Sequence, residues 1–202
     1  MNEASAIDFY FDFSSPYSYL LSEKIDTLAG HFGRKVRWHP ILLGIVFQHH
    51  GSKPLADIPF KNDYMRHDVP RSARFLGVPF QWPTRFPIPT QAAARSYYWL
   101  HGQDCTLARR FAHATFRALF MEDRDISSPD VVLDIGAGLD IDRAALTNAI
   151  ASPEMKDKLK LACAEAISKG VFGAPWVIID GEAFWGVDRL PQMQELLEKG
   201  AI

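Results

Sequence analysis

The chain has 202 residues, of which 48% are hydrophobic and 23% are charged, and its formal net charge at pH 7 is -2. This composition indicates a folded protein with one sizeable core and at most two compact units, and it excludes a disordered chain. The near-neutral charge gives no basis for binding nucleic acid or an anionic membrane surface, and no apolar run is long enough to span a bilayer.

The chain opens with the pattern of a strand, a helix and a second strand. Residues 7–13 alternate apolar and polar side chains, which predicts a strand. Ser15-Pro16 follows with the chemistry of a helix N-cap and a first helical position, and apolar residues then recur at helical spacing until Gly30. Residues 34–42 predict a second strand, so we expect a parallel crossover unit.

The middle of the chain, from 45 to 170, has helical periodicity and few strand signals. Ser128-Pro129 and Ser152-Pro153 have the form of two further helix starts. Pro70 and the prolines of residues 79–89 are expected to break the chain. We expect about four to six helices joined by loops.

The end of the chain returns to strands. Residues 176–179 form a short apolar run, Asp180-Gly181 is a strong hairpin turn, and residues 182–185 are the expected partner strand. Residues 189–199 place apolar side chains at helical spacing and predict a closing amphipathic helix.

This order of elements predicts an α/β protein with a thioredoxin-like fold that carries an inserted all-helical domain. We expect residues 1–44 and 171–202 to form the thioredoxin-like domain and residues 45–170 to form the helical insertion.

Cys105 and Cys163 are the two cysteines of the sequence. They fit neither a zinc spacing nor a disulfide framework, and both lie in helical patterns. We expect both to pack as small apolar residues in or near the core.

Pro175, in Gly173-Ala174-Pro175-Trp176, lies just before the first strand of the C-terminal unit. Since proline cannot donate to a sheet ladder, it belongs at a strand start or in a tight turn. Thioredoxin-like folds hold a cis-proline at this place, and the preceding residue presents its backbone to an extended peptide ligand. We therefore expect a cis Ala174–Pro175 bond, although a trans loop proline is the commoner arrangement.

Ser15 stands where the first strand meets the first helix. A hydroxyl and backbone N–H groups at a helix start stabilise an anion, including a thiolate, although a plain N-cap is the alternative interpretation. Thioredoxin-like redox enzymes carry Cys-x-x-Cys here, whereas this chain has Ser15-Pro16-Tyr17-Ser18. Dithiol exchange by this site is therefore excluded, and any sulfur must come from a ligand.

Asp188 lies where the predicted hairpin enters the last helix. It either caps that helix or binds an ammonium group at the end of a peptide-like ligand. Gly186 next to it permits close approach of a backbone.

Three motifs carry a family resemblance. Residues 11–20 read FDFSSPYSYL, residues 171–175 read VFGAP and residues 185–190 read WGVDRL. In this order and spacing, over nearly the whole chain, they resemble the 2-hydroxychromene-2-carboxylate isomerases. That family is grouped with the kappa-class glutathione transferases and the DsbA-like branch of the thioredoxin superfamily.

The resemblance implies a glutathione site. Ser15 matches the family's catalytic serine, which hydrogen-bonds the glutathione sulfur, and Tyr17 is assigned to the same site. Ala174, before Pro175, matches the residue whose backbone pairs with the cysteinyl part of glutathione. Val187 and Asp188 match the pair that holds the γ-glutamyl end of glutathione, and Trp185 is assigned to the site beside them.

The resemblance gives two further assignments. At the first the chain departs from the family pattern, and at the second the match is looser. Ser52 falls near a position that is asparagine in kappa transferases. Phe86 and Pro87 fall near the second-substrate pocket of the isomerases.

The activity that the resemblance implies is the cis–trans isomerisation of 2-hydroxychromene-2-carboxylate or a related aromatic catabolite. A glutathione thiolate adds to a conjugated carbon, the ring opens, a single bond rotates and the thiolate leaves, so glutathione is regenerated. Ser15 and the helix start would lower the thiol pKa. Donors for the developing enolate or phenolate stay open among Lys53, Lys61, Arg85 and Arg95.

Two alternatives remain at this point. A kappa-like transferase would conjugate glutathione to an electrophile and release the adduct. A peptide-binding module would use the groove beside Pro175 without any enzymatic activity. In either enzymatic case we expect a cytoplasmic homodimer whose partner is a small aromatic substrate, with no nucleic acid or membrane partner.

Two other motifs are interpreted as structural. Residues 134–138 resemble part of a dinucleotide-binding loop but lack its third glycine, so a helix end followed by a turn is predicted. His49, His50 and His67 have no carboxylate or cysteine at a supporting spacing, and we expect no metal site there.

Overall fold

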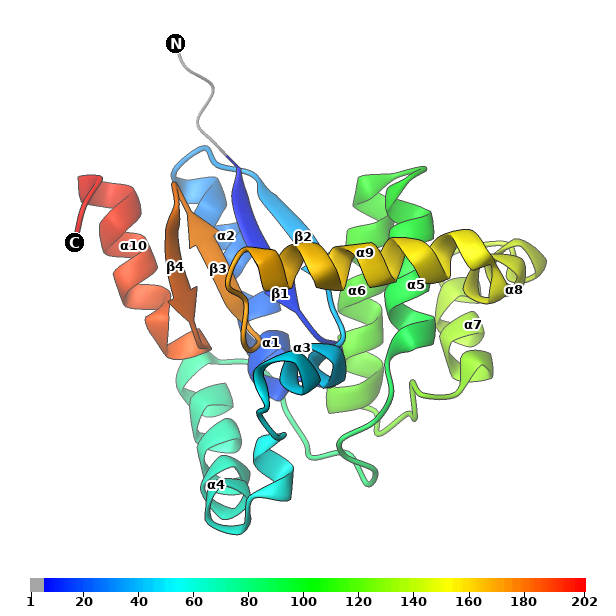
Figure 1. Cartoon of the computed structure of the whole chain (residues 1–202), viewed down its shortest axis with the longest axis horizontal. Helices are drawn as coiled ribbons and strands as arrows, with labels where there is room; N and C mark the ends of the chain where they lie inside the picture. Colours follow the sequence, from blue (N-terminus) through cyan, green and yellow to red (C-terminus); the bar gives the residue numbers. More distant parts are fainter. Residues whose placement is uncertain (1–5) are drawn as a thin grey trace.

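A four-stranded mixed sheet lies at the centre of the computed structural model, which describes residues 6–202 (Figure 1). Its strands are β1 (Ile7–Phe11), β2 (Val36–Pro40), β3 (Trp176–Ile179) and β4 (Glu182–Trp185), in the spatial order β2-β1-β3-β4. The β1–β2 pair is parallel, whereas the β1–β3 and β3–β4 pairs are antiparallel. The first and last parts of the chain therefore meet in one sheet, as the order of elements predicts.

The core is built on the aromatic residues of β1. Phe9 and Phe11 are fully buried and pack edge-on against Trp38 of β2, with ring centroids 5.1 Å and 5.4 Å away. Phe11 also contacts Phe116 from the helical part of the chain at 5.5 Å. One continuous core therefore joins the sheet to the helices. The domain boundaries expected from the sequence stay a prediction.

The first predicted helix is broken into two. Helix α1 (Pro16–Ser22) and helix α2 (Ile25–His31) are separated at Glu23 and Lys24. The Glu23 carboxylate accepts a hydrogen bond from Arg117 at 2.6 Å and lies 3.2 Å from the His113 ring. These partners lie about ninety residues further along the chain, so the local pattern that predicts a continuous helix contains no sign of them.

Seven α-helices and one short 3-10 helix lie between the second and third strands, within residues 43–168. Seven α-helices exceed the four to six that the sequence predicts for this region. The elements are α3 (Leu43–His50), η1 (Leu55–Asp57), α4 (Pro59–Leu76), α5 (Gln91–His101), α6 (Cys105–Phe120), α7 (Pro129–Ala137), α8 (Arg143–Ala151) and α9 (Pro153–Ser168).

The prolines of this region have different positions in the helices. Pro70 lies inside α4 and does not end it, contrary to expectation. Pro129 and Pro153 begin α7 and α9, so both predicted helix starts are confirmed. The Ser152 hydroxyl caps α9 by accepting from the Met155 N–H at 3.2 Å, whereas the Ser128 side chain makes no such bond with α7. Helix α7 ends before Gly138, so residues 134–138 are the predicted helix end.

The helices surround the sheet unevenly (Figure 1). Helix α9 crosses in front of the strands, α4 projects away from the sheet, and α5 to α8 gather on the side of β2. None of the helices within residues 6–202 combines the length and the apolar composition needed to cross a lipid bilayer.

The C-terminal hairpin has the predicted turn. Asp180 and Gly181 both have positive φ angles, 51° and 93°, which matches the twist of a tight two-residue hairpin. A short 3-10 helix, η2 (Val187–Arg189), then leads into α10 (Leu190–Lys199). Arg189 is the residue before α10 and no side chain caps this helix, so the capping role considered for Asp188 is wrong.

The two cysteines differ in their surroundings. Cys163 of α9 is fully buried, and its sulfur accepts a hydrogen bond from the Leu42 N–H at 3.3 Å. Cys105 is exposed at the first position of α6, so the prediction that both pack in the core is wrong for this residue. The apolar pattern of α6 begins later, on the face that carries Phe111.

Candidate active site

Ser15 is held at the junction of β1 and α1 by hydrogen bonds on both sides. Its backbone is extended, with φ -88° and ψ 114°, and its hydroxyl oxygen accepts from the Ser18 N–H at 3.2 Å. The N-cap prediction is therefore confirmed. The same hydroxyl donates to the carbonyl oxygen of Ala174 at 3.1 Å. One side chain thus joins the start of the chain to the loop before β3.

The Ala174–Pro175 peptide bond is cis, as the motif predicts. Pro175 directly precedes β3, and its carbonyl accepts from the Gly186 N–H at 3.1 Å. Trp185 lies over this loop, since a Cβ atom at Gly173 would come within 2.6 Å of the Trp185 Nε1 atom. Only glycine fits at position 173 without moving the indole ring.

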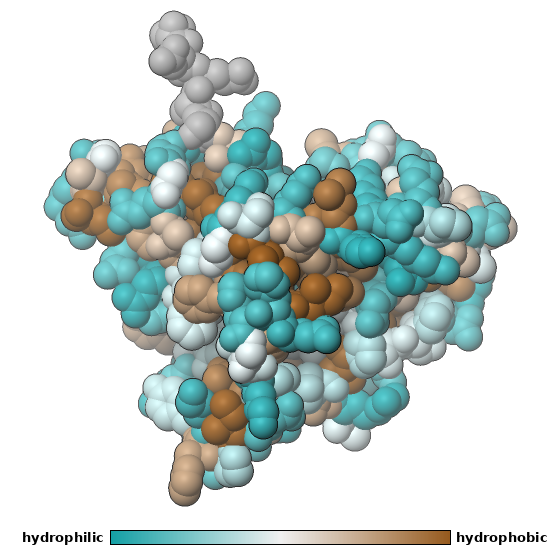
Figure 2. Space-filling model, in the orientation of Figure 1, coloured by the Kyte–Doolittle hydropathy of each residue, from teal (hydrophilic) through white to brown (hydrophobic). Residues whose placement is uncertain are grey.

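A cavity of about 910 Å³ opens beside Ser15 and Ala174, within the size range of small-molecule sites. Figure 2 shows apolar surface on this face of the molecule, around α3 and beside the start of α4. Seven of the predicted site residues line the cavity: Ser15, Tyr17, Ser52, Phe86, Pro87, Ala174 and Trp185. They come from five separate segments, which the fold brings to one hollow.

Three of the predicted residues do not line this cavity. Pro175 is not part of the lining, although Ala174 before it is, and Val187 is buried with 4% of its surface exposed. Asp188 is exposed, and its carboxylate accepts from the Arg189 guanidinium at 2.7 Å. The structure therefore does not bring Val187 and Asp188 to the cavity wall, and their contact with a ligand stays a prediction.

Tyr17 faces the cavity but has its hydroxyl engaged. The hydroxyl donates to the Asp68 carboxylate of α4 at 2.8 Å. Burial and the neighbouring Asp68 charge raise the pKa of Tyr17 above its ordinary value, so the phenol stays protonated. Its clearest role in the structure is to hold α4 against α1.

The four candidate cations divide into two pairs. Lys53 and Lys61 line the cavity. Arg85 instead forms an ion pair with Asp125, and Arg95 donates to the Ile150 carbonyl at 3.3 Å. The lysines are therefore the cations available to an anionic ligand.

Two buried polar residues of the cavity wall are not among those that the sequence predicts. Asp12 and Thr90 are 5% and 2% exposed and are joined by a hydrogen bond of 2.9 Å. The signal for Asp12 is a carboxylate between two phenylalanines, directly after the last residue of the first strand. The cis Phe86–Pro87 bond was also missed, since nothing in the local sequence distinguishes it.

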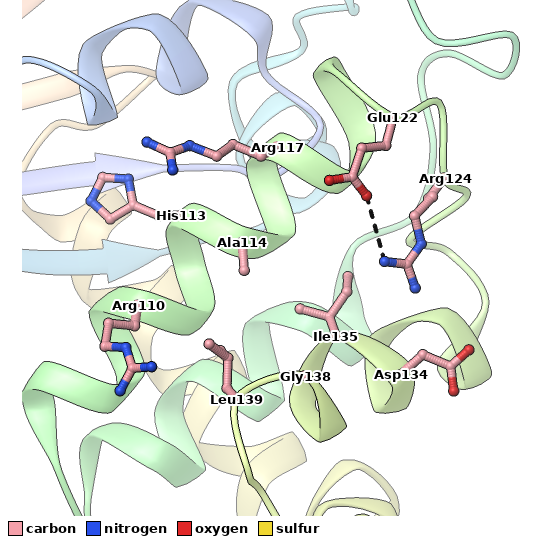
Figure 3. A pocket seen from close by; sticks show the side chains of 10 residues that line it. All are labelled: Arg110, His113, Ala114, Arg117, Glu122, Arg124, Asp134, Ile135, Gly138 and Leu139. Carbon is pink, nitrogen blue, oxygen red and sulfur yellow. Dashed lines mark ion pairs between the residues drawn. The ribbon is translucent and has the colours of Figure 1, made fainter.

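A second hollow, of about 570 Å³, lies between α6 and α7 (Figure 3). Arg110, His113 and Arg117 line it from α6, and Ile135 and Leu139 line it from the opposite side. Most of its polar side chains already have partners: Arg117 binds Glu23, which also lies 3.2 Å from the His113 ring, and Arg124 lies 3.6 Å from Glu122. None of the predicted site residues lies here.

The fold and the serine at this helix start define a thioredoxin-like protein without redox cysteines at its site. The family model described as "DSBA-like thioredoxin domain" matches residues 6–198, and the chain belongs to this family.

Within the family, the chain is similar to enzymes of two kinds. It is 31% identical to a 2-hydroxychromene-2-carboxylate isomerase of Sphingobium xenophagum over 194 residues, covering 95% of this chain and 97% of the relative. It is 28% identical to the glutathione S-transferase kappa 1 of Caenorhabditis elegans, covering 98% and 93%. A solved 2-hydroxychromene-2-carboxylate isomerase superposes with a TM-score of 0.88 at 26% identity, covering 96% and 95%. The resemblance inferred from the three motifs is thus confirmed, and an enzyme of the isomerase type is supported.

Proposed function

We propose that this protein uses glutathione to isomerise 2-hydroxychromene-2-carboxylate or a related aromatic catabolite. The observation that carries the proposal is the 3.1 Å hydrogen bond between the Ser15 hydroxyl and the Ala174 carbonyl, beside cis-Pro175 and at the wall of a large cavity. A serine occupies the place of a redox cysteine, so the sulfur must arrive with a ligand.

The residues at this wall fit a cysteinyl tripeptide. The Ser15 hydroxyl lies next to the backbone of Ala174, so a thiol and a peptide group of one ligand reach both at once. Gly173 and Gly186 allow the Trp185 indole and the Asp188 carboxylate to pack directly on the backbone at this wall, because a Cβ atom at either position would collide with them. Lys53 and Lys61 supply positive charge for the carboxylates of glutathione or of the substrate.

Bound glutathione would supply a thiolate that adds reversibly to the conjugated carbon of the substrate, so that a double bond loses its rigidity and the cofactor is recovered. Ser15 would stabilise the ionised sulfur by donating a hydrogen bond from its hydroxyl, because a hydrogen bond to the charged form favours that form. To do so, the hydroxyl turns away from the Ala174 carbonyl. Lys53 and Lys61 would stabilise negative charge that develops on the substrate oxygen.

The test begins with glutathione binding. We expect a saturable ultraviolet thiolate band when wild-type protein is titrated with glutathione, and a loss of most of this band in Ser15→Ala. Ser22→Ala is the matched control, because Ser22 is a buried serine whose hydroxyl donates to the Tyr19 carbonyl at 2.7 Å, away from the cavity. No thiolate band at millimolar glutathione in the wild type would contradict the proposal.

A kappa-like transferase is the second candidate, favoured by the Caenorhabditis elegans relative, which matches 98% of this chain. The two activities differ in the fate of glutathione. An isomerase returns one free thiol for each turnover, whereas a transferase consumes it. Counting free thiol after complete conversion of the chromene carboxylate distinguishes them.

A homodimer is part of the same proposal, because identical chains commonly assemble in pairs. Light scattering of the purified protein measures its mass directly. A measured mass equal to that of one chain would contradict the homodimer and would leave the proposed reaction unaffected.

A further inference from the structure

Asp12 is a buried carboxylate at the end of β1, with 5% of its surface exposed. Its Oδ1 atom accepts from the Ser14 N–H at 2.8 Å and from the Thr90 hydroxyl at 2.9 Å, and its Oδ2 atom accepts from the Leu43 N–H at 2.7 Å. Burial raises the pKa of this carboxyl, and these three donors partly offset the rise. Burying an acidic group without a cationic partner lowers the stability of the folded protein. A carboxyl group that is kept in such a place therefore points to a structural or functional role.

The three donors belong to three different walls of the cavity. Ser14 precedes Ser15, Leu43 begins α3, and Thr90 precedes α5. All three residues line the cavity, as does Asp12 itself. The carboxylate is therefore the point at which the serine loop, α3 and the approach to α5 are joined.

A second hydrogen bond reinforces the connection to the approach to α5. The Ser14 hydroxyl accepts from the Ile88 N–H at 3.1 Å. The segment that carries Phe86 and Pro87 is thus held to the serine loop at two points, Ile88 and Thr90. Since Ser15 directly follows Ser14, these bonds set the separation between Ser15 and the opposite wall.

Thr90 shows that this connection takes precedence over local helix stability. It occupies the N-cap position of α5, where a threonine hydroxyl ordinarily accepts from the N–H groups of its own helix. No such bond forms, and the hydroxyl donates to Asp12 instead. Ser152, by contrast, caps α9 in the ordinary way.

We propose that Asp12 is a positioning residue that, together with Ser14, fixes the Phe86–Thr90 wall relative to Ser15 and so determines how the second substrate is held against the thiol. This inference rests on the proposed function, because it assigns Phe86 and Pro87 to the substrate side of the cavity. Asp12 acts through Ser14, Leu43 and Thr90 and not on the reacting atoms.

Thr90→Val is the most direct variant, because it keeps the shape of the side chain and removes the donor to Asp12. Ser14→Ala removes the other connection, to Ile88. Asp12→Asn places an amide N–H against a backbone N–H and weakens the whole junction. Thr115→Val is the matched control, since Thr115 is also fully buried and donates one hydrogen bond, to the Phe111 carbonyl at 2.8 Å within α6.

We expect Thr90→Val and Ser14→Ala each to raise the KM for the chromene carboxylate roughly tenfold, equal to about 1.4 kcal/mol. The glutathione Kd should change less than about twofold, and Thr115→Val should change neither constant. In the Asp12→Asn background, Thr90→Val should have little further effect, because its partner is already altered. Equal losses of glutathione affinity and substrate affinity would overturn the proposal.

Hydrogen exchange gives a readout that does not depend on activity. In Thr90→Val, amides of residues 86–91 should exchange faster than in the wild type, while those of residues 106–120 should not change. Unchanged exchange in residues 86–91 would overturn the positioning role. If the wild type binds no glutathione, the proposed function fails, and the exchange experiment still decides whether Asp12 holds this wall.

Discussion

Asp8 and Asp12 stand four residues apart at the two ends of β1, and both are nearly buried, at 8% and 5% exposure. Asp8 is bound by two side chains of β2: Arg37 donates to it twice at 2.8 Å, and a ring nitrogen of His39 lies 2.7 Å away. Asp12 is bound by two backbone N–H groups and a hydroxyl. The first carboxylate links neighbouring strands, whereas the second links the walls of a cavity.

The difference shows in the pKa directions. Burial alone would raise the pKa of Asp8, but the hydrogen bonds and charges of His39 and Arg37 outweigh it and leave the pKa below its ordinary value. At Asp12 burial prevails and the pKa is raised. At one end of the strand the ion pair of Asp8 stabilises the fold. At the other end the burial of the Asp12 carboxylate is unfavourable, and this end lies at the candidate site.

The largest expected effect is that of Asp12→Ala. Two backbone N–H groups and the Thr90 hydroxyl would lose their acceptor in the interior, so we expect the free energy of unfolding to fall by about 3–5 kcal/mol. Urea unfolding followed by circular dichroism measures it. A loss no larger than that of Asp8→Asn would remove the contrast between the two ends of β1.

Asp8→Asn should cost less, about 1–2 kcal/mol near neutral pH, because Arg37 is largely exposed and is rehydrated when the ion pair is lost. The sign with pH follows from the lowered pKa. The stabilisation is fully present above the ordinary aspartate pKa of about 3.9, and it is lost as pH falls through the lower folded value. When unfolding is measured at several acidic pH values, the free energies of unfolding of the wild type and of Asp8→Asn should converge as pH falls.

The raised pKa of Asp12 gives the opposite slope. Between the ordinary pKa and the raised folded pKa, the folded protein retains a proton that the unfolded chain has lost, so stability falls as pH rises. Asp12→Asn removes this dependence. Parallel pH profiles for Asp8→Asn and Asp12→Asn would contradict the assignment.

Glu23→Gln extends the comparison to a third carboxylate. The hydrogen bonds of Glu23 with His113 and Arg117 outweigh its burial and lower its pKa to about 2. We expect a loss of about 1 kcal/mol above the ordinary glutamate pKa of about 4.3. The loss should disappear as pH falls towards 2. Thermal unfolding at pH 7 and at acidic pH measures it.

Tyr10→Phe should have the smallest effect. The Tyr10 hydroxyl accepts from the Lys169 ammonium at 2.9 Å, on the strand between the two aspartates. Removing one partly buried hydrogen bond is expected to cost about 0.5–1 kcal/mol and to leave glutathione binding unchanged. A change in the thiolate band would show that this part of β1 is coupled to the cavity.

The sequence predicts the strands, the hairpin turn and the helix starts because each has a local chemical signature, such as Asp180-Gly181 or Ser152-Pro153. It does not predict the break at Glu23, because the partners of Glu23 lie on α6. The same limit applies to the site. Ser15, Ala174 and Trp185 belong to recognisable motifs. The role of Asp12, by contrast, depends on hydrogen bonds from Leu43 and Thr90, which only the folded chain brings close to it.

The hydrogen bond between Ser15 and Ala174 joins residues 159 positions apart, and this has a consequence for biosynthesis. β1 can pair with β2 as soon as the first 40 residues are made. The other edge of β1 stays unpaired until β3 is made, and β3 begins at Trp176. A growing chain on the ribosome therefore exposes one edge of β1, with the Ser15 wall incomplete, until almost the whole protein has been made. Chains that stop before Trp176 should consequently be substrates for chaperones and proteases, and they should have no glutathione chemistry of their own.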